Sequence, residues 1–223
     1  NHKFIMEIGF GGCNSREELN KYLPKGWNFK DDKYWDCHSY PTEDGRTTGL
    51  DYLFDGVEDS NEELVSASRA YQAEAYKYVV ERSRIRPYFN GICLWNYRDG
   101  FPIFSSAFVG YDGDKRPAYF AVKNSYEPVQ CIMKYENGKV EVYIVNDTPF
   151  EGKVGLKLSN ASKKEIEIKA NDILLADTVS CGENELITSE LSVDGKTVKN
   201  YLYTYSRKID YAKYKKLSGN KDE

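Results

Sequence analysis

Lys3-Phe4-Ile5-Met6-Glu7-Ile8-Gly9-Phe10 is an almost continuous apolar run with one carboxylate in it and a glycine two residues after that carboxylate. A short run of aromatic and β-branched residues predicts a strand buried on both faces, as in a parallel sheet covered by helices. Glu7 needs an explanation there, because a carboxylate is rarely buried without a partner. The carboxyl end of a parallel barrel strand is where enzymes of that fold carry catalytic groups. Glu7 is therefore a candidate catalytic residue; the alternatives are an edge strand with Glu7 in water, or a buried ion pair.

The composition is that of an ordinary globular protein, with 223 residues of which 40% are hydrophobic and 30% charged. This length suits one large domain or two modest ones. The net charge of -4 and the lack of a long basic block argue against a nucleic-acid partner. No apolar run is long enough to span a bilayer, so we expect no membrane partner, and the compartment stays open.

Two residue types bear on the kind of ligand. The 19 tyrosines are compatible with carbohydrate handling, because a tyrosine stacks on a sugar ring and still offers a hydrogen bond, although aromatic strands of a β-sandwich would also explain them. The five cysteines are odd in number and widely spaced, without a CxxC pair. This pattern suggests neither a disulfide framework nor a zinc site, and we expect no cofactor.

The first half of the chain follows the order strand, helix, helix, strand. Capping boxes at Ser15 and Ser60 predict two helix starts, and the second helix continues toward Arg82. The segment 25–59 has no sustained period and is expected to be a long loop with at most one helical turn. The run Gly91-Ile-Cys-Leu-Trp-Asn96 predicts a second strand buried on both faces. This order is typical of a parallel α/β fold, and two strands are a quarter of the eight in a (β/α)8 barrel.

From Glu127-Pro128 onward the period changes to two. Val140, Val142 and Ile144 alternate with polar residues, and Asn137-Gly138 and Asp194-Gly195 are hairpin turns. Short alternating strands with regular turns predict an antiparallel β-sandwich of immunoglobulin type. We therefore divide the chain into an α/β part at 1–126, a sandwich at 127–206 and a polar, lysine-rich tail at 207–223 that is expected to fray.

Two segments carry a resemblance to a known family. Gly91-Ile-Cys-Leu-Trp-Asn-Tyr-Arg-Asp-Gly-Phe-Pro102 and Lys115-Arg-Pro-Ala-Tyr-Phe-Ala121 resemble the end of the catalytic barrel of family 2 glycoside hydrolases, most of all the β-mannosidase and exo-β-glucosaminidase branch. Phe4-Ile-Met-Glu-Ile-Gly-Phe10 is similar to the strand that carries the nucleophile of that family. The resemblance covers residues 3 to about 206. It implies the last two βα units of a (β/α)8 barrel followed by an immunoglobulin-like sandwich, with Glu7 as nucleophile of a retaining glycosidase.

The resemblance also implies substrate-binding residues, each with a plainer alternative. Trp95 is similar to the tryptophan under the sugar, or it simply packs at the end of the barrel. Asp99 holds a loop or a sugar hydroxyl, or is a turn aspartate before Gly100. Asn96 stands where the family has glutamine. His38 lies in the long loop where related enzymes place substrate-facing residues, although a lone loop histidine is commonly a surface side chain.

Three residues depart from the family pattern: Met6 replaces a serine, Asn96 a glutamine and Arg98 an asparagine. An arginine beside the sugar site can pair with a carboxylate, so the substrate need not be a plain β-mannoside. β-Galactosidase and exo-β-glucosaminidase specificities stay open within the family.

The second catalytic carboxylate is missing from the sequence. The family's acid/base glutamate follows an asparagine on an earlier barrel strand, and neither Asn61-Glu62 nor Asn184-Glu185 is in such a position. We therefore expect a C-terminal piece of a longer enzyme, inactive alone, whose partners are its missing N-terminal part and a carbohydrate substrate. The exposed edges of the barrel strands would also allow a homo-oligomer. The alternative is a non-catalytic carbohydrate-binding or structural module.

Overall fold

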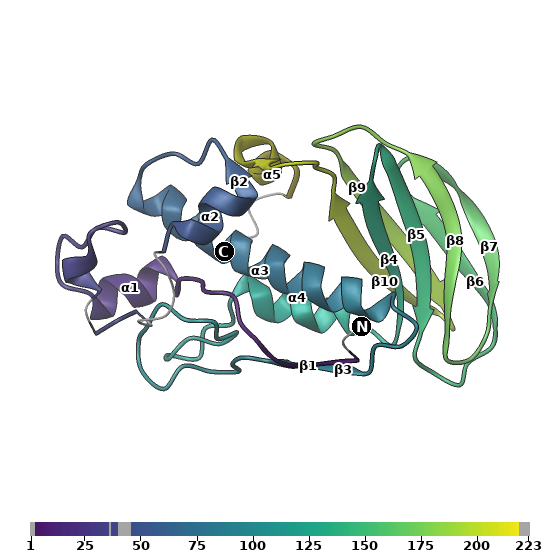
Figure 1. The fold of residues 1–223 in the computed structure, drawn as a ribbon, viewed down its shortest axis with the longest axis horizontal. Coiled ribbons are helices and arrows are strands. Elements are labelled where there is room, and N and C mark those ends of the chain that lie inside the picture. The colour runs from purple at the N-terminus through teal and green to yellow at the C-terminus, as the bar shows by residue number, and fades with distance from the viewer. Residues whose placement is uncertain (1–2, 36, 40–45, 219–223) are drawn as a thin grey trace.

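The computed structural model describes residues 3–35, 37–39 and 46–218, and Figure 1 shows their arrangement. The first part of the chain forms β1 (Phe4–Ile8), α1 (Arg16–Tyr22), the 3-10 helix η1 (Asp32–Tyr34), α2 (Thr48–Leu53), β2 (Phe54–Asp55), α3 (Asn61–Arg84), β3 (Gly91–Leu94) and α4 (Pro117–Ser125). The second part forms β4 (Val129–Glu136), β5 (Lys139–Asn146), β6 (Gly152–Leu158), β7 (Ala161–Ile168), β8 (Asp172–Ser180), β9 (Leu186–Val193), β10 (Lys196–Tyr203), β11 (Ile209–Asp210) and α5 (Tyr211–Ser218).

The two strands expected in the first half are present and parallel. β1 pairs with β3, and Phe4 lies opposite Gly91. The prediction that both strands are buried on both faces is wrong, because Phe4 is 43% and Met6 78% exposed, and Cys93 on β3 is exposed as well. The physical reason is the size of the sheet: within the described residues it contains only these two strands, so nothing covers their outer edges.

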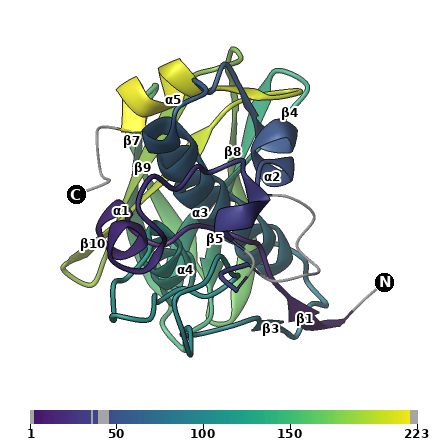
Figure 2. The same cartoon turned by 90° about the vertical axis from the view of Figure 1, so that its left-hand side faces the viewer.

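Both predicted helix starts are confirmed. The Ser15 and Ser60 side chains accept hydrogen bonds from the backbone N–H groups three residues later, at Glu18 and Glu63, as N-caps do. The second of these helices, α3, has 24 residues and lies in the middle of the molecule, with β1 and β3 along one side of it (Figures 1 and 2). It is therefore the central element of the fold.

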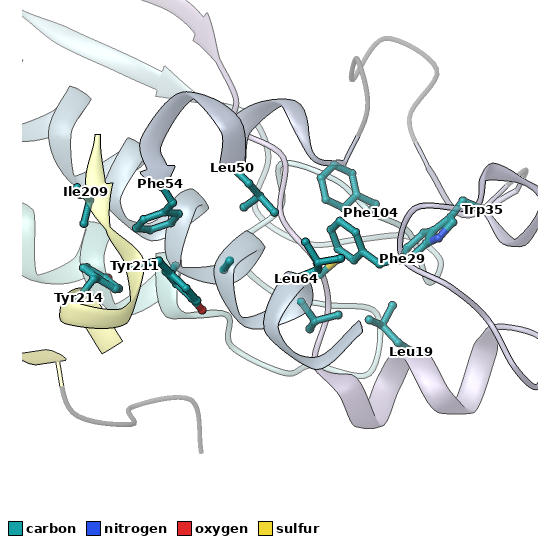
Figure 3. Close-up of a cluster of buried hydrophobic side chains, with 14 of the residues drawn as sticks. Leu19, Phe29, Trp35, Leu50, Phe54, Leu64, Phe104, Ile209, Tyr211 and Tyr214 are labelled. Carbon is teal, nitrogen blue, oxygen red and sulfur yellow. The ribbon is translucent and has the colours of Figure 1, made fainter. Parts of the chain in front are cut away.

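The segment 25–59 is more ordered than the sequence predicts, since it contains η1, α2 and β2; residues 36 and 40–45 lie outside the described part. Its aromatic side chains are buried: Trp27 and Trp35 are 8% and 1% exposed and pack edge to face at 6.0 Å. Figure 3 shows Trp35 and Phe29 at one end of a cluster that extends to Tyr214. The tryptophans of this segment thus belong to a hydrophobic core.

Residues 129–203 form two antiparallel sheets with the strand orders β4-β5-β8 and β10-β9-β6-β7. Their inward side chains share one hydrophobic core, so the expected sandwich of alternating strands is present. Asn137 and Gly138 turn the β4–β5 hairpin with φ angles of 51° and 74°, and Asp194 and Gly195 turn the β9–β10 hairpin with 45° and 75°. Positive φ at both central positions is what this hairpin turn demands.

The sandwich is attached to α3 through buried polar groups. Lys77 and Glu81 form an ion pair at 2.7 Å in which both side chains are almost fully buried. Asn200 of β10 donates to Glu81 Oε1 at 3.0 Å and to the carbonyl oxygen of Cys131 at 2.8 Å. Because a buried charge is tolerated only with partners, these contacts define how the sandwich sits against the helix.

Residues 207–218 differ from the frayed tail that the sequence predicts for 207–223, and residues 219–223 lie outside the described part. β11 pairs with β2, and α5 follows it directly. Tyr211 is 2% exposed and its ring lies 4.9 Å from that of Phe54; Ile209 is 1% exposed (Figure 3). Tyr211 and Tyr214, which stand between the lysines, are both buried, which explains why a lysine-rich composition was misleading.

Replacing Tyr211 by alanine should lower the free energy of unfolding by about 3–5 kcal/mol, the usual cost of removing a buried aromatic ring. Lys213→Ala, on the exposed side of α5, should change it by less than about 0.5 kcal/mol. Urea unfolding of the two variants checks this. Equal stability of Tyr211→Ala and the native chain would mean that α5 is frayed after all.

Candidate active site

The site is built at the carboxyl ends of β1 and β3. Glu7 is exposed near the end of β1. Between the pairs Ile5–Ile92 and Ile8–Leu94 the register shifts, because β1 has two residues, Met6 and Glu7, where β3 has only Cys93. An extra residue of this kind bends a strand and re-aims a side chain, and such irregularities are frequent beside active sites.

Trp95 and Asn96 follow β3 directly and lie at the same end as Glu7. The Trp95 N–H donates to the carbonyl oxygen of Ile8 at 2.8 Å, which extends the pairing of the two strands. The Trp95 side chain is 45% exposed, so its ring is not enclosed in a core. The peptide bond between Trp95 and Asn96 is cis. The amide oxygen of Asn96 is buried and has no hydrogen-bond partner among the described residues.

Asp99 occupies a different environment, since it is 5% exposed and both carboxylate oxygens are bonded. One oxygen accepts from the Ser105 hydroxyl at 2.6 Å, and the other pairs with the Arg116 guanidinium at 2.5 Å. Substrate contact through Asp99 stays a prediction. The contacts themselves support the loop-holding alternative.

Arg116 is the residue on which the loops converge. It is 0% exposed, and its Nη1 lies within 3.0 Å of the carbonyl oxygens of Gly12, Ser105 and Ala107. Its Nη2 bonds the side-chain oxygen of Asn14 in addition to Asp99. Gly12 and Asn14 follow β1, whereas Ser105 and Ala107 follow β3, so one guanidinium ties both loops together.

His38 is held at the edge of the same region. Its Nδ1 lies 2.6 Å from the carbonyl oxygen of Pro102 and its own carbonyl oxygen accepts from the Phe104 N–H at 2.7 Å. A carbonyl oxygen can only accept, so Nδ1 carries a proton and Nε2 is the basic nitrogen of the neutral ring. The ring is therefore anchored to the loop after β3.

Sequence reasoning missed Arg116 and the buried carboxylate Glu18. Arg116 stands directly before Pro117 at the start of α4. It lies in the motif that carries the family resemblance, but the resemblance assigned it no role. Glu18 Oε1 accepts from Asn14 Nδ2 at 2.6 Å and from the Tyr111 N–H at 3.0 Å, while Oε2 has no partner among the described residues. Burial raises the pKa of Glu18 above its usual range.

Within residues 3–35, 37–39 and 46–218 no cluster of three or more histidine, cysteine, aspartate or glutamate side chains could hold a metal ion. In the same ranges no helix is both long and apolar enough to cross a membrane.

No protein-family model and no curated protein matches the chain. Its fold is nevertheless that of part of two solved glycosidases. The β-D-mannosidase of Dictyoglomus thermophilum superposes with a TM-score of 0.76 and 20% identity over 90% of this chain and 27% of that one. An exo-chitosanase of Amycolatopsis orientalis gives 0.65 and 16% over 90% and 27%.

The chain thus spans about a quarter of the length of the structures that it matches. At these identities the likeness establishes the fold. The resemblance to family 2 glycosidases of the β-mannosidase branch, inferred from the motifs, is confirmed at that level.

Breaking the Asp99–Arg116 pair should be costly. Asp99→Ala leaves a buried guanidinium without its carboxylate and should lower the free energy of unfolding by about 3–5 kcal/mol. Arg98→Ala, which removes an exposed side chain one position earlier, should cost less than about 1 kcal/mol. Urea unfolding of both variants is the measurement. Similar losses of stability in the two would contradict the structural importance of the Asp99–Arg116 pair.

Glu18 should make stability depend on pH. Its folded-state pKa lies above the unfolded value of about 4.5, so the folded state binds more protons between the two values. Its contribution is therefore full below about pH 4.5 and is lost as the pH rises through the raised pKa. Glu18→Gln should remove this slope, seen as a native-minus-variant difference in unfolding free energy that changes between pH 4.5 and 8. A difference that is constant across this pH range would refute the predicted contribution of Glu18.

Proposed function

We propose that this chain is the C-terminal portion of a retaining glycoside hydrolase that acts on β-linked sugars, with β-mannosidase-like specificity. The observation that carries the proposal is the position of Glu7, exposed at the irregular carboxyl end of β1 beside the half-exposed Trp95 at the end of β3. In this reading β1, α3, β3 and α4 are the last two βα units of a (β/α)8 barrel, and the two sheets are an immunoglobulin-like sandwich.

The chemistry gives each residue a role. The Glu7 carboxylate attacks the anomeric carbon of the sugar, and the bond to the leaving oxygen breaks as a glycosyl ester forms. A second carboxyl group about 5 Å away protonates the leaving oxygen and then activates the water that hydrolyses the ester. Trp95 provides an apolar face for the sugar ring, and Asn96 and His38 supply hydrogen-bonding groups at its edge.

The second carboxyl group belongs to sequence outside this chain. Of the two Asn-Glu pairs, Asn61-Glu62 lies in the first turn of α3, where Glu62 is paired with Arg16 at 2.8 Å, while Asn184-Glu185 lies in the turn before β9. Neither is on a strand beside β1. The chain alone thus has a nucleophile without an acid/base and is proposed to be inactive by itself.

The exposed surfaces of the β1–β3 sheet support a proposal for where a missing part of the enzyme would bind. Met6 and Phe4 expose 78% and 43% of their surface, and both outer strand edges lack partners among the described residues. Unpaired strand edges bind further strands. We propose that upstream barrel strands of the same enzyme occupy them, and that without these strands a second copy of the chain is the alternative partner.

The proposal predicts the behaviour of Glu7→Gln in the complete enzyme of which this chain would be part. Removing the nucleophile should lower kcat for aryl β-glycosides by several orders of magnitude. Glu17→Gln, the same change on an exposed residue of α1, should leave kcat unchanged. A loss of tenfold or less for Glu7→Gln would disprove the assignment. Sugar binding without turnover, unaffected by Glu7→Gln, would instead establish a non-catalytic carbohydrate-binding module.

A further inference from the structure

The buried side of α3 carries three polar residues one helical turn apart: Ser68, Gln72 and Tyr76. They are 1%, 0% and 0% exposed. Buried polar groups require hydrogen-bond partners, so these side chains constrain whatever backbone lies against them. The backbone in question is the segment that follows β1.

Hydrogen bonds join these α3 side chains to the backbone of the segment after β1. Ser68 Oγ accepts from the Cys13 N–H at 3.1 Å, and Gln72 Nε2 donates to the Phe10 carbonyl oxygen at 2.9 Å. One turn further, Tyr76 Oη accepts from the Phe10 N–H at 3.2 Å. Both polar groups of the Phe10 backbone are therefore bonded by α3, three residues after Glu7.

Tyr76 also reaches the segment after β3. Its hydroxyl lies 2.5 Å from the carbonyl oxygen of Trp95 and 2.8 Å from that of Ser106. Its ring packs against Phe10 and Phe108, with centroid distances of 5.1 and 4.7 Å. One phenol group thus holds the backbone that continues from Glu7 and the backbone of Trp95 itself.

We propose that Tyr76 is a positioning residue of the candidate active site: its hydroxyl fixes the distance between the strand end that carries Glu7 and the backbone of Trp95. This inference rests on the proposed function. Tyr76 acts through the Phe10 and Trp95 backbones and does not touch the sugar. Reacting groups must be placed to within a fraction of an ångström, and a displacement of 1 Å can cost about a hundredfold in rate.

Tyr76→Phe is the informative variant, because it keeps the ring and removes only the hydroxyl. Tyr203→Phe is the matched control: Tyr203 is 3% exposed, and its hydroxyl has no hydrogen-bond partner among the described residues. Both variants remove one buried phenol oxygen. Only the first removes a link between the two strand ends.

The first measurement is acrylamide quenching of tryptophan fluorescence in this 223-residue chain. Trp95 is 45% exposed, whereas Trp27 and Trp35 are 8% and 1% exposed, so the quenchable emission comes mainly from Trp95. Tyr76→Phe should change the quenching constant while the far-UV circular dichroism stays native, and Tyr203→Phe should leave both unchanged. An unchanged constant in Tyr76→Phe overturns the proposal.

The second measurement is steady-state kinetics in the complete enzyme with aryl β-glycosides. Tyr76→Phe should lower kcat by about ten- to a hundredfold with KM within about threefold, and Tyr203→Phe should retain kcat. A native kcat in Tyr76→Phe, or equal losses in both variants, overturns the positioning role. A native enzyme that hydrolyses no aryl β-glycoside instead overturns the proposed function. The quenching experiment then still decides whether the Tyr76 hydroxyl positions Trp95.

Discussion

The charge of Arg116 is the constraint around which the α/β half is arranged. A guanidinium with no exposed surface loses its hydration, and its charge has to be compensated by protein atoms. Its two terminal nitrogens are bonded by the Asp99 carboxylate and by backbone carbonyls from the loops after both β1 and β3, whereas Nε has no partner among the described residues. The loops are thus drawn to one point, and the two strand ends that carry Glu7 and Trp95 are kept beside each other although their own sheet has only two strands.

Much of the fold follows from local sequence signals. Ser15 and Ser60 cap helices because their side chains satisfy backbone donors within one turn, and the Asn137-Gly138 hairpin forms because both residues tolerate positive φ. These effects depend on neighbours in the sequence alone. The position of Glu7 at a strand end also followed from its apolar run, once the run was recognised as a strand.

Structural features that depend on residues far apart in the sequence could not be predicted from local sequence signals. The exposure of β1 follows from a sheet that has only two strands among the described residues, and no local pattern reports how many strands a sheet contains. The packing of Tyr211 depends on Phe54, 157 positions earlier, so the lysines around it dominated the expectation of a frayed tail. Arg116 and Tyr76 resemble ordinary helix residues in the sequence, and their importance arises only from the backbone groups that converge on them in space.

The attachment of the sandwich to α3 has a consequence for how the two halves of the chain can evolve. Asn200 is bonded to Glu81, and Glu81 lies only five positions along the helix from Tyr76, a distance of about 7.5 Å. A rigid helix transmits a tilt imposed at one turn to the next. A homologous domain that replaced the sandwich would therefore have to keep an asparagine in the position of Asn200, or the tilt of α3 would change at Tyr76 and at the ends of β1 and β3.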